Sequence, residues 1–218
     1  MSRLIPLFPA LALLGCAAPA VGYAPGTTAA QRDQLHRNTT PPEVAELTAL
    51  TSTTVQAEFD LPIDELERWF LDKPLEDILR GHESIPAVRT TVPLSDAWGR
   101  PGDRRRVELA DQSAALEQVL DNELPVRFRY VVWNYTSNVA RYVDYGVGEF
   151  RFEPAGNRTR VTWTYAFKPK RSVYAGPLRR FVEGEYRDFM IVSVGHMQHS
   201  AASWSPGAAS DDPQVSTR

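Results

Sequence analysis

The chain has 218 residues, of which 24 are Lys or Arg and 27 are Asp or Glu, so its formal net charge at pH 7 is -3. A mildly acidic chain lacks the basic surface that nucleic-acid binding requires, and we therefore exclude a nucleic-acid partner. Apolar residues make up 43% of the chain and charged residues 23%, which is typical of a folded globular domain. The length allows one such domain with additional tails.

Residues 1–15 have the pattern of a secretory signal peptide. Arg3 supplies a positive charge, an apolar run over residues 4–14 is too short to span a bilayer, and Gly15 is the small residue that a signal peptidase needs. We therefore expect residues 1–15 to be removed and the rest of the chain to face away from the cytoplasm.

Cys16 is the only cysteine, so no disulfide can form within the chain. The run Leu13-Leu14-Gly15-Cys16 resembles the bacterial lipobox. That resemblance implies a lipoprotein whose Cys16 is lipidated and anchors the protein to a membrane of the bacterial cell envelope. The alternative is an ordinary signal peptide cleaved near Ala18 or Ala20.

Residues 16–52 are rich in Ala, Pro, Thr and Gly, which predicts a flexible tether. Within it, Thr40-Pro41-Pro42-Glu43 is similar to a capping box and predicts a short helix that ends at Leu50. The composition of residues 201–218 predicts a disordered tail.

The folded part is expected over residues 53–200. Residues 53–59 alternate as a strand does, residues 62–70 have helical apolar spacing, and a short helix follows at 75–79. Six further strands are predicted at 87–94, 103–110, 114–120, 126–133, 145–153 and 159–167. A long helix is predicted from Pro177 to His199, weakened by Gly184 and Gly195.

This order of elements resembles the helix-grip fold of START-like and Bet v 1-like proteins. Three turn-and-strand motifs are similar to those of the SRPBCC superfamily, often labelled polyketide cyclase or dehydrase: Gly99-x-Pro101-Gly102, Leu124-Pro125-x-Arg127-Phe128-x-Tyr130 and Gly156-x-x-Thr159-x-Val161-x-Trp163. The resemblance implies an α+β fold in which a curved antiparallel sheet of about seven strands wraps around the C-terminal helix and encloses a hydrophobic cavity.

Alternation along the strands and the apolar helix face select the candidate cavity residues. They are Phe128, Tyr130, Val132, Trp163, Tyr165 and Phe189. The alternative interpretation is that these side chains only fill the core. The run Arg104-Arg105-Arg106 is interpreted as a solvated sheet edge, because alternation divides it between the two faces.

Catalysis would require a titratable group inside the cavity. The candidate catalytic residues are Glu149, Tyr130 and Tyr165, and Glu117, Asp144, Glu185 and His196 are further titratable candidates. The four histidines are not in a zinc-ligand order, and no nucleotide-binding motif is present in the sequence, so we expect neither a metal nor a cofactor.

These observations lead to three hypotheses. The first is a membrane-tethered binding protein that holds a hydrophobic small molecule or lipid in a helix-grip cavity. The second is an enzyme, a lyase similar to a polyketide cyclase or dehydratase. The third is a structural or interaction domain with a filled core. We favour the first because an exported protein would rarely meet substrates made on cytosolic synthases.

Overall fold

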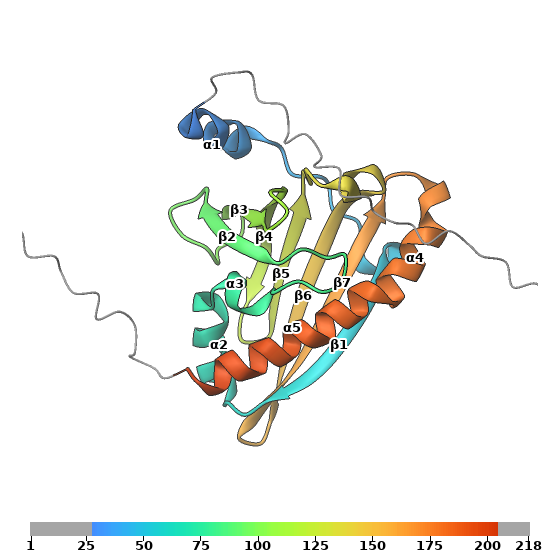
Figure 1. Cartoon of the computed structure of the whole chain (residues 1–218). Helices are drawn as coiled ribbons and strands as arrows, with labels where there is room; N and C mark the ends of the chain where they lie inside the picture. Colours follow the sequence, from blue (N-terminus) through green and yellow to red (C-terminus); the bar gives the residue numbers. More distant parts are fainter. Residues whose placement is uncertain (1–27, 205–218) are drawn as a thin grey trace, which may run out of the picture.

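The structure is a computed structural model that describes residues 28–204 (Figure 1). The predicted signal peptide 1–15, the predicted lipidation residue Cys16 and the first part of the predicted tether lie outside the described residues. So do residues 205–218 of the predicted tail. The description below concerns residues 28–204.

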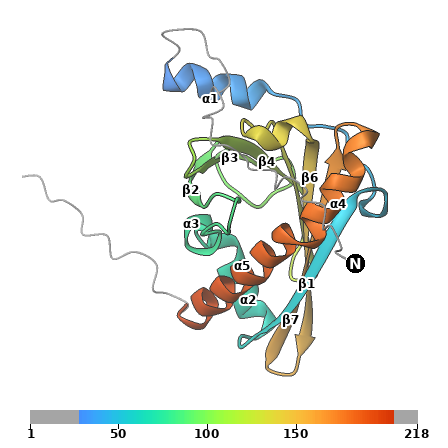
Figure 2. The same ribbon diagram turned by 45° about the vertical axis from the view of Figure 1, so that its right-hand side comes forward.

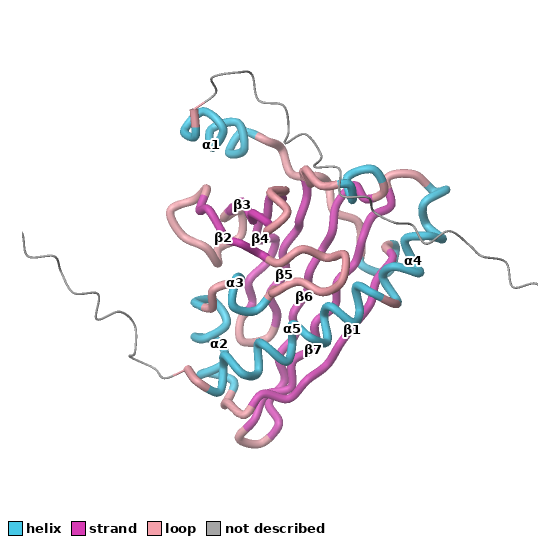
Figure 3. The backbone as a smooth tube through the Cα atoms, viewed as in Figure 1, coloured by secondary structure: helices cyan, strands magenta, loops and turns pink. Residues whose placement is uncertain are grey.

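Seven strands form one antiparallel sheet in the order β1-β7-β6-β5-β4-β3-β2 (Figure 3). The strands are β1 (Thr51–Phe59), β2 (Val88–Pro93), β3 (Arg104–Leu109), β4 (Ala114–Glu123), β5 (Arg127–Trp133), β6 (Val143–Ala155) and β7 (Arg158–Pro169). All seven predicted strands are thus confirmed, with ends that differ by about three residues or fewer. The first strand of the chain, β1, is paired along its whole length with the last strand, β7.

Two helices, α2 (Ile63–Asp72) and α3 (Leu75–Ile78), connect β1 to β2. The predicted C-terminal helix is two helices, α4 (Ala175–Glu183) and α5 (Glu185–Ala202), separated by Gly184. The backbone of Gly184, with φ -107° and ψ -105°, is not helical, and glycine adopts such a conformation more readily than other residues. Gly195 is accommodated within α5. Among residues 28–204, no helix combines the length and the apolar character needed to cross a bilayer.

The C-terminal helices lie against β1 on the inner, concave face of the sheet, and α5 runs obliquely along β1 and β7 (Figures 1 and 2). Helix α2 contacts β6 and β7. In β7 the inner residues Thr159, Val161 and Trp163 are buried, whereas Arg160 between them is exposed. The main core therefore lies between the inner face and the helices, and the predicted α+β helix-grip fold is confirmed.

Residues 28–50, which the sequence assigns to the tether, pack on the opposite, outer face of the sheet. They contain α1 (Ala29–Asn38) and a single 3-10 turn, Leu47–Ala49, in place of the predicted short helix ending at Leu50. Val44, Leu47 and Leu50 cover an outer apolar cluster made of Leu94, Leu116, Val131, Trp133, Tyr145 and Val147. Burial of this cluster gives the segment a fixed place on the domain.

Polar contacts hold the same segment to the sheet. The Tyr145 hydroxyl accepts a hydrogen bond from the Ala45 backbone N–H at 3.0 Å. The Arg104 guanidinium donates to the backbone carbonyls of Arg37 and Thr39 at 2.8 and 2.9 Å. We call residues 28–50 the N-terminal strap.

Candidate ligand-binding site

The six cavity residues expected from the sequence all lie in the inner core. Phe128 and Trp163 are each only 2% exposed, and Val132, Tyr165 and Phe189 are also buried, whereas Tyr130 is half-buried. The Phe150 ring stacks on Trp163 with centroids 5.1 Å apart and meets the Phe70 ring edge-on at 4.9 Å. The centre of the grip is therefore packed with aromatic side chains, as the filled-core alternative expects.

Two glycines of β6 shape the inner face beside this core. A Cβ built on Gly148 would stand 2.2 Å from Cζ of Tyr130, and one built on Gly146 would stand 2.8 Å from the hydroxyls of Tyr135 and Tyr165. No real Cβ fits at such distances, so only glycine lets these rings lie against the strand. The sequence signal was a pair of glycines two residues apart in a strand, which sequence reasoning missed.

Four tyrosines lie close together near Gly146 and Gly148, and we call them the tyrosine cluster: Tyr130, Tyr135, Tyr165 and Tyr186. The Tyr165 ring lies 6.3 Å from Tyr130 and 5.0 Å from Tyr186, measured between centroids. Tyr165 is buried and the other three are half-buried, so the cluster reaches from the core toward solvent.

Burial raises the pKa of every hydroxyl in the tyrosine cluster, and the nearby Glu117 carboxylate adds to the rise. These phenols are therefore neutral at physiological pH and can donate hydrogen bonds. The Tyr135 hydroxyl and the Trp163 indole N–H have no hydrogen-bond partner among the described residues. Buried donors without partners are costly, and a ligand oxygen would satisfy them.

A charged pair adjoins the tyrosine cluster. The Arg105 Nε donates to Glu117 at 2.6 Å, and the guanidinium carbon lies 3.8 Å from the centre of the Trp98 ring. Glu117 is 6% exposed. Arg105 thus lies on the inner face, whereas its neighbour Arg104 lies on the outer face under the strap. The interpretation of the whole arginine run as a solvated edge is wrong for Arg105, because this position faces the core.

Lys73, at the end of α2, also contributes to the interior. Its ammonium lies 3.4 Å from the centroid of the Phe70 ring and 6.0 Å from that of Phe150, and it donates to the Phe70 carbonyl. Burial, followed by repulsion from Arg105, lowers the pKa of Lys73 well below its ordinary value. The sequence carried no signal for this residue, because a lysine at a helix end is usually solvated.

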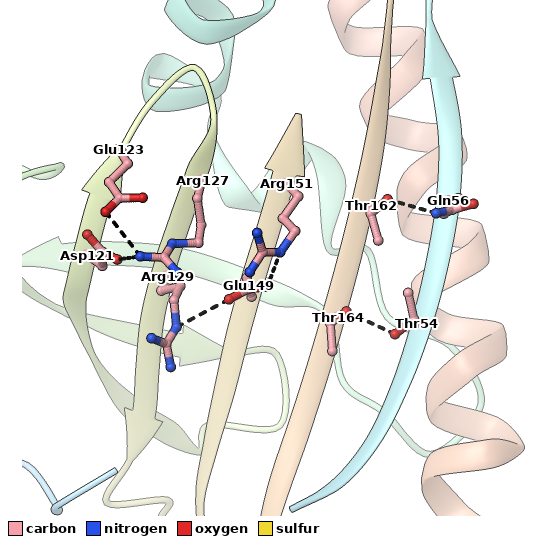
Figure 4. Close-up of polar contacts among 10 residues, drawn as sticks. All are labelled: Thr54, Gln56, Asp121, Glu123, Arg127, Arg129, Glu149, Arg151, Thr162 and Thr164. Carbon is pink, nitrogen blue, oxygen red and sulfur yellow. Dashed lines mark hydrogen bonds and ion pairs between the residues drawn. The ribbon is translucent and has the colours of Figure 1, made fainter. Parts of the chain in front are cut away.

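Glu149, the carboxylate proposed from the sequence as catalytic, lies on the outer face of β6 and not in the interior. Its carboxylate pairs with Arg151 at 2.7 Å and with Arg129 at 3.4 Å (Figure 4). The neighbouring residues Phe150 and Phe152 face the core, so the two-residue period of the strand directs Glu149 outward. Glu149 therefore does not line the interior, in contrast to the position expected from the sequence.

Two of the remaining titratable candidates, Glu185 and His196, are engaged by residues of α3 and of the loop that follows it. The Glu185 carboxylate accepts hydrogen bonds from the backbone N–H and hydroxyl of Ser84. The His196 Nδ1 lies 3.0 Å from the Ile78 carbonyl. Within residues 28–204, no group of three or more His, Cys, Asp or Glu side chains could hold a metal ion.

A cavity of about 340 Å³ lies where β5 ends and β6 begins, and it adjoins the tyrosine cluster through Tyr135. Its lining residues come from the strap, from the β5–β6 connection and from the strand ends: Thr40, Pro42, Trp133, Asn134, Tyr135, Ala140, Val143, Asp144 and Lys170. Ligand pockets of proteins typically begin at about 300 Å³. The candidate site is therefore the tyrosine cluster together with this cavity.

Comparisons with solved structures support the fold. The chain is similar to Ara h 8.0201, with a TM-score of 0.54 and 12% identity over 70% of this chain and 98% of the other. For a protein from Arthrobacter aurescens the TM-score is 0.52 and the identity 16%, over 80% and 98% of the two chains. For major latex-like protein 151 from Panax ginseng the values are 0.51 and 14%, over 68% and 95%. At such low identity these likenesses establish the fold alone.

A search of curated proteins found no match. Residues 50–190 match the model of a family described as polyketide cyclase / dehydrase and lipid transport. This region begins at the end of the strap and covers the whole sheet, the α2–α3 connection, α4 and the first part of α5. The chain therefore belongs to the polyketide cyclase / dehydrase and lipid transport family.

Proposed function

We propose that this protein binds a hydrophobic small molecule or lipid at the tyrosine cluster and the adjoining cavity. The observation that carries the proposal is the half-buried state of Tyr130, Tyr135 and Tyr186, three aromatic residues that contact the core yet remain accessible. Each methylene that a ligand buries against such rings contributes roughly 0.8 kcal/mol to binding. The family description, which includes lipid transport, supports the same class of ligand.

We further propose that the protein acts at the bacterial cell envelope, anchored by a lipid on Cys16. The support is the signal-like pattern of residues 1–15 and the lipobox-like sequence before the only cysteine. Radiolabelled fatty acid should be incorporated into the wild-type chain and not into Cys16→Ser. Equal labelling of the two chains would contradict the anchor and leave the ligand proposal standing.

Binding is tested with the full chain carrying Cys16→Ser, so that no attached acyl chain can occupy the site. The neutral fluorescent probe N-phenyl-1-naphthylamine should bind with a saturable increase in fluorescence. Ala140→Trp places an indole in the cavity wall and should weaken binding by about tenfold or more, a loss of 1.4 kcal/mol. Ala110→Trp, on an exposed turn outside the site, is the matched control.

Failure of the probe to bind, or an equal effect of the two tryptophans, would contradict the proposal. Organic extraction of the purified protein followed by mass spectrometry provides a second readout. We expect an apolar molecule to be released by the Cys16→Ser chain and to be absent from the same chain with Ala140→Trp.

A further inference from the structure

Among the described residues of the inner face, basic side chains outnumber carboxylates. Two cations, Lys73 and Arg105, and one carboxylate, Glu117, influence one another there. Glu117 is engaged by Arg105 at 2.6 Å. Among the described residues no carboxylate forms an ion pair with Lys73, whose ammonium donates to the Phe70 carbonyl. Lys73 thus lacks a counter-charge among the described residues.

The hydrogen-bonding groups of the interior are likewise mostly donors. The ammonium of Lys73 has three donor hydrogens and no acceptor, and the neutral phenols of the tyrosine cluster can each donate one. The Trp163 indole N–H adds one further donor, and neither it nor the Tyr135 hydroxyl has a partner in the described part of the chain. Among residues 28–204, Glu117 is the carboxylate that influences these groups, and its charge is already matched by Arg105. No unengaged carboxylate of the described residues is therefore available to these donors.

The Lys73 side chain lies beside the candidate site and not at the far surface. The Lys73 ammonium is 6.0 Å from the centroid of Phe150, and the Tyr130 ring stacks on the same Phe150 ring at 6.4 Å. A lysine that only capped α2 could reach the Phe70 carbonyl from solvent. Here the ammonium lies over the Phe70 ring, at 3.4 Å from its centroid, and that ring packs against Phe128 of the core.

We infer that the ligand of this protein is an amphiphile with one anionic oxygen-bearing group, such as a carboxylate or sulfonate, which Lys73 binds beside Tyr130. This inference rests on the proposed function, because it concerns the same site. An anion at Lys73 supplies the counter-charge that Lys73 lacks and favours its ammonium form, and the oxygens of the anion accept hydrogen bonds from that ammonium. The apolar part of the ligand lies against the tyrosine cluster.

Two probes that share one aromatic scaffold test the inference. N-phenyl-1-naphthylamine is neutral, and 1-anilinonaphthalene-8-sulfonate has the same rings with a sulfonate. In the Cys16→Ser chain, Lys73→Met should weaken binding of the sulfonate by about tenfold and leave the affinity for the neutral probe within about twofold. Lys73→Arg, which keeps the charge, should retain most of the affinity for the sulfonate.

Lys168→Met is the matched control, since it removes a lysine from β7 outside the candidate site. Thermal unfolding of each variant verifies that it is folded, and Lys73→Gln serves as a second charge-removing variant if the methionine does not fold. An equal change for both probes, or no change for either, would overturn the inference and leave the proposed function intact. If the Cys16→Ser chain without a further substitution bound neither probe, both the inference and the proposed function would be overturned.

Discussion

The Tyr130 ring lies against the backbone of Gly148, its register partner on the neighbouring strand, so closely that a Cβ on Gly148 would stand 2.2 Å from Tyr130 Cζ. This contact fixes the position of a ring that belongs both to the core and to the accessible part of the candidate site. Strand β6 therefore supports the tyrosine cluster, because tyrosine rings pack directly against its glycines.

Gly148→Ala should destabilise the protein by about 2 kcal/mol, because the added methyl group forces Tyr130 out of its place. Urea unfolding measures the change. Gly195→Ala in α5, where a Cβ meets nothing within 4 Å, should raise the stability by up to about 1 kcal/mol. In a Tyr130→Ala background the cost of Gly148→Ala should fall by at least half; an unchanged cost would show that Tyr130 is not the residue displaced.

Glu117→Gln should destabilise the protein by about 3 kcal/mol, because it leaves the largely buried Arg105 without its counter-charge. Glu123→Gln is the matched control, since the Glu123 side chain is 56% exposed and pairs with Arg127 on the outer face. It should change the stability by less than about 0.5 kcal/mol. Chemical denaturation of both variants at neutral pH provides the measurement, and similar losses for the two would contradict a special role for the inner pair.

The tyrosine cluster should make the protein sensitive to alkali. Burial raises the pKa of the four phenols above the value of 10 that they have in the unfolded chain. Above pH 10 the unfolded chain therefore releases protons that the folded chain retains, and stability falls as the pH rises. Stability should be independent of these groups below pH 10.

Absorbance at 295 nm, which reports phenolate, measures this ionisation. The chain has eight tyrosines, and the part of the signal due to the cluster should appear only together with the loss of secondary structure seen by circular dichroism. Full ionisation of all tyrosines while the protein is still folded would contradict the burial of the cluster.

Leu47→Asp should destabilise the protein by about 2 kcal/mol, because it places a carboxylate on the outer apolar cluster that the strap covers. Thr48→Asp introduces the same charge at the adjacent, exposed position and should be close to neutral. Urea unfolding of the two variants distinguishes a packed strap from a loose tether; equal stabilities would indicate that the strap contributes nothing.

Much of the fold could be predicted because alternation in the strands is clear where one face meets solvent. Around Glu149 the order Glu149-Phe150-Arg151-Phe152 already assigns the phenylalanines to the core and the charges to the outside, so the outward placement of Glu149 could have been found. The inward placement of Glu117 could not have been predicted in the same way. Leu116 and Val119 there are apolar on opposite faces, because the strap buries the outer face at this end of the sheet.

The sequence by itself determined the strands, the helices that follow β1 and the family that they resemble, because these depend on local periodicity and on short motifs. Only the tertiary structure decided which polar groups meet inside. Lys73, Arg105 and Glu117 come from α2, β3 and β4, and their proximity depends on how the helix crosses the sheet. The position of the strap was also decided by the tertiary structure. Its sequence has no regular apolar period, so its position is fixed only by the apolar surface of the sheet that it covers.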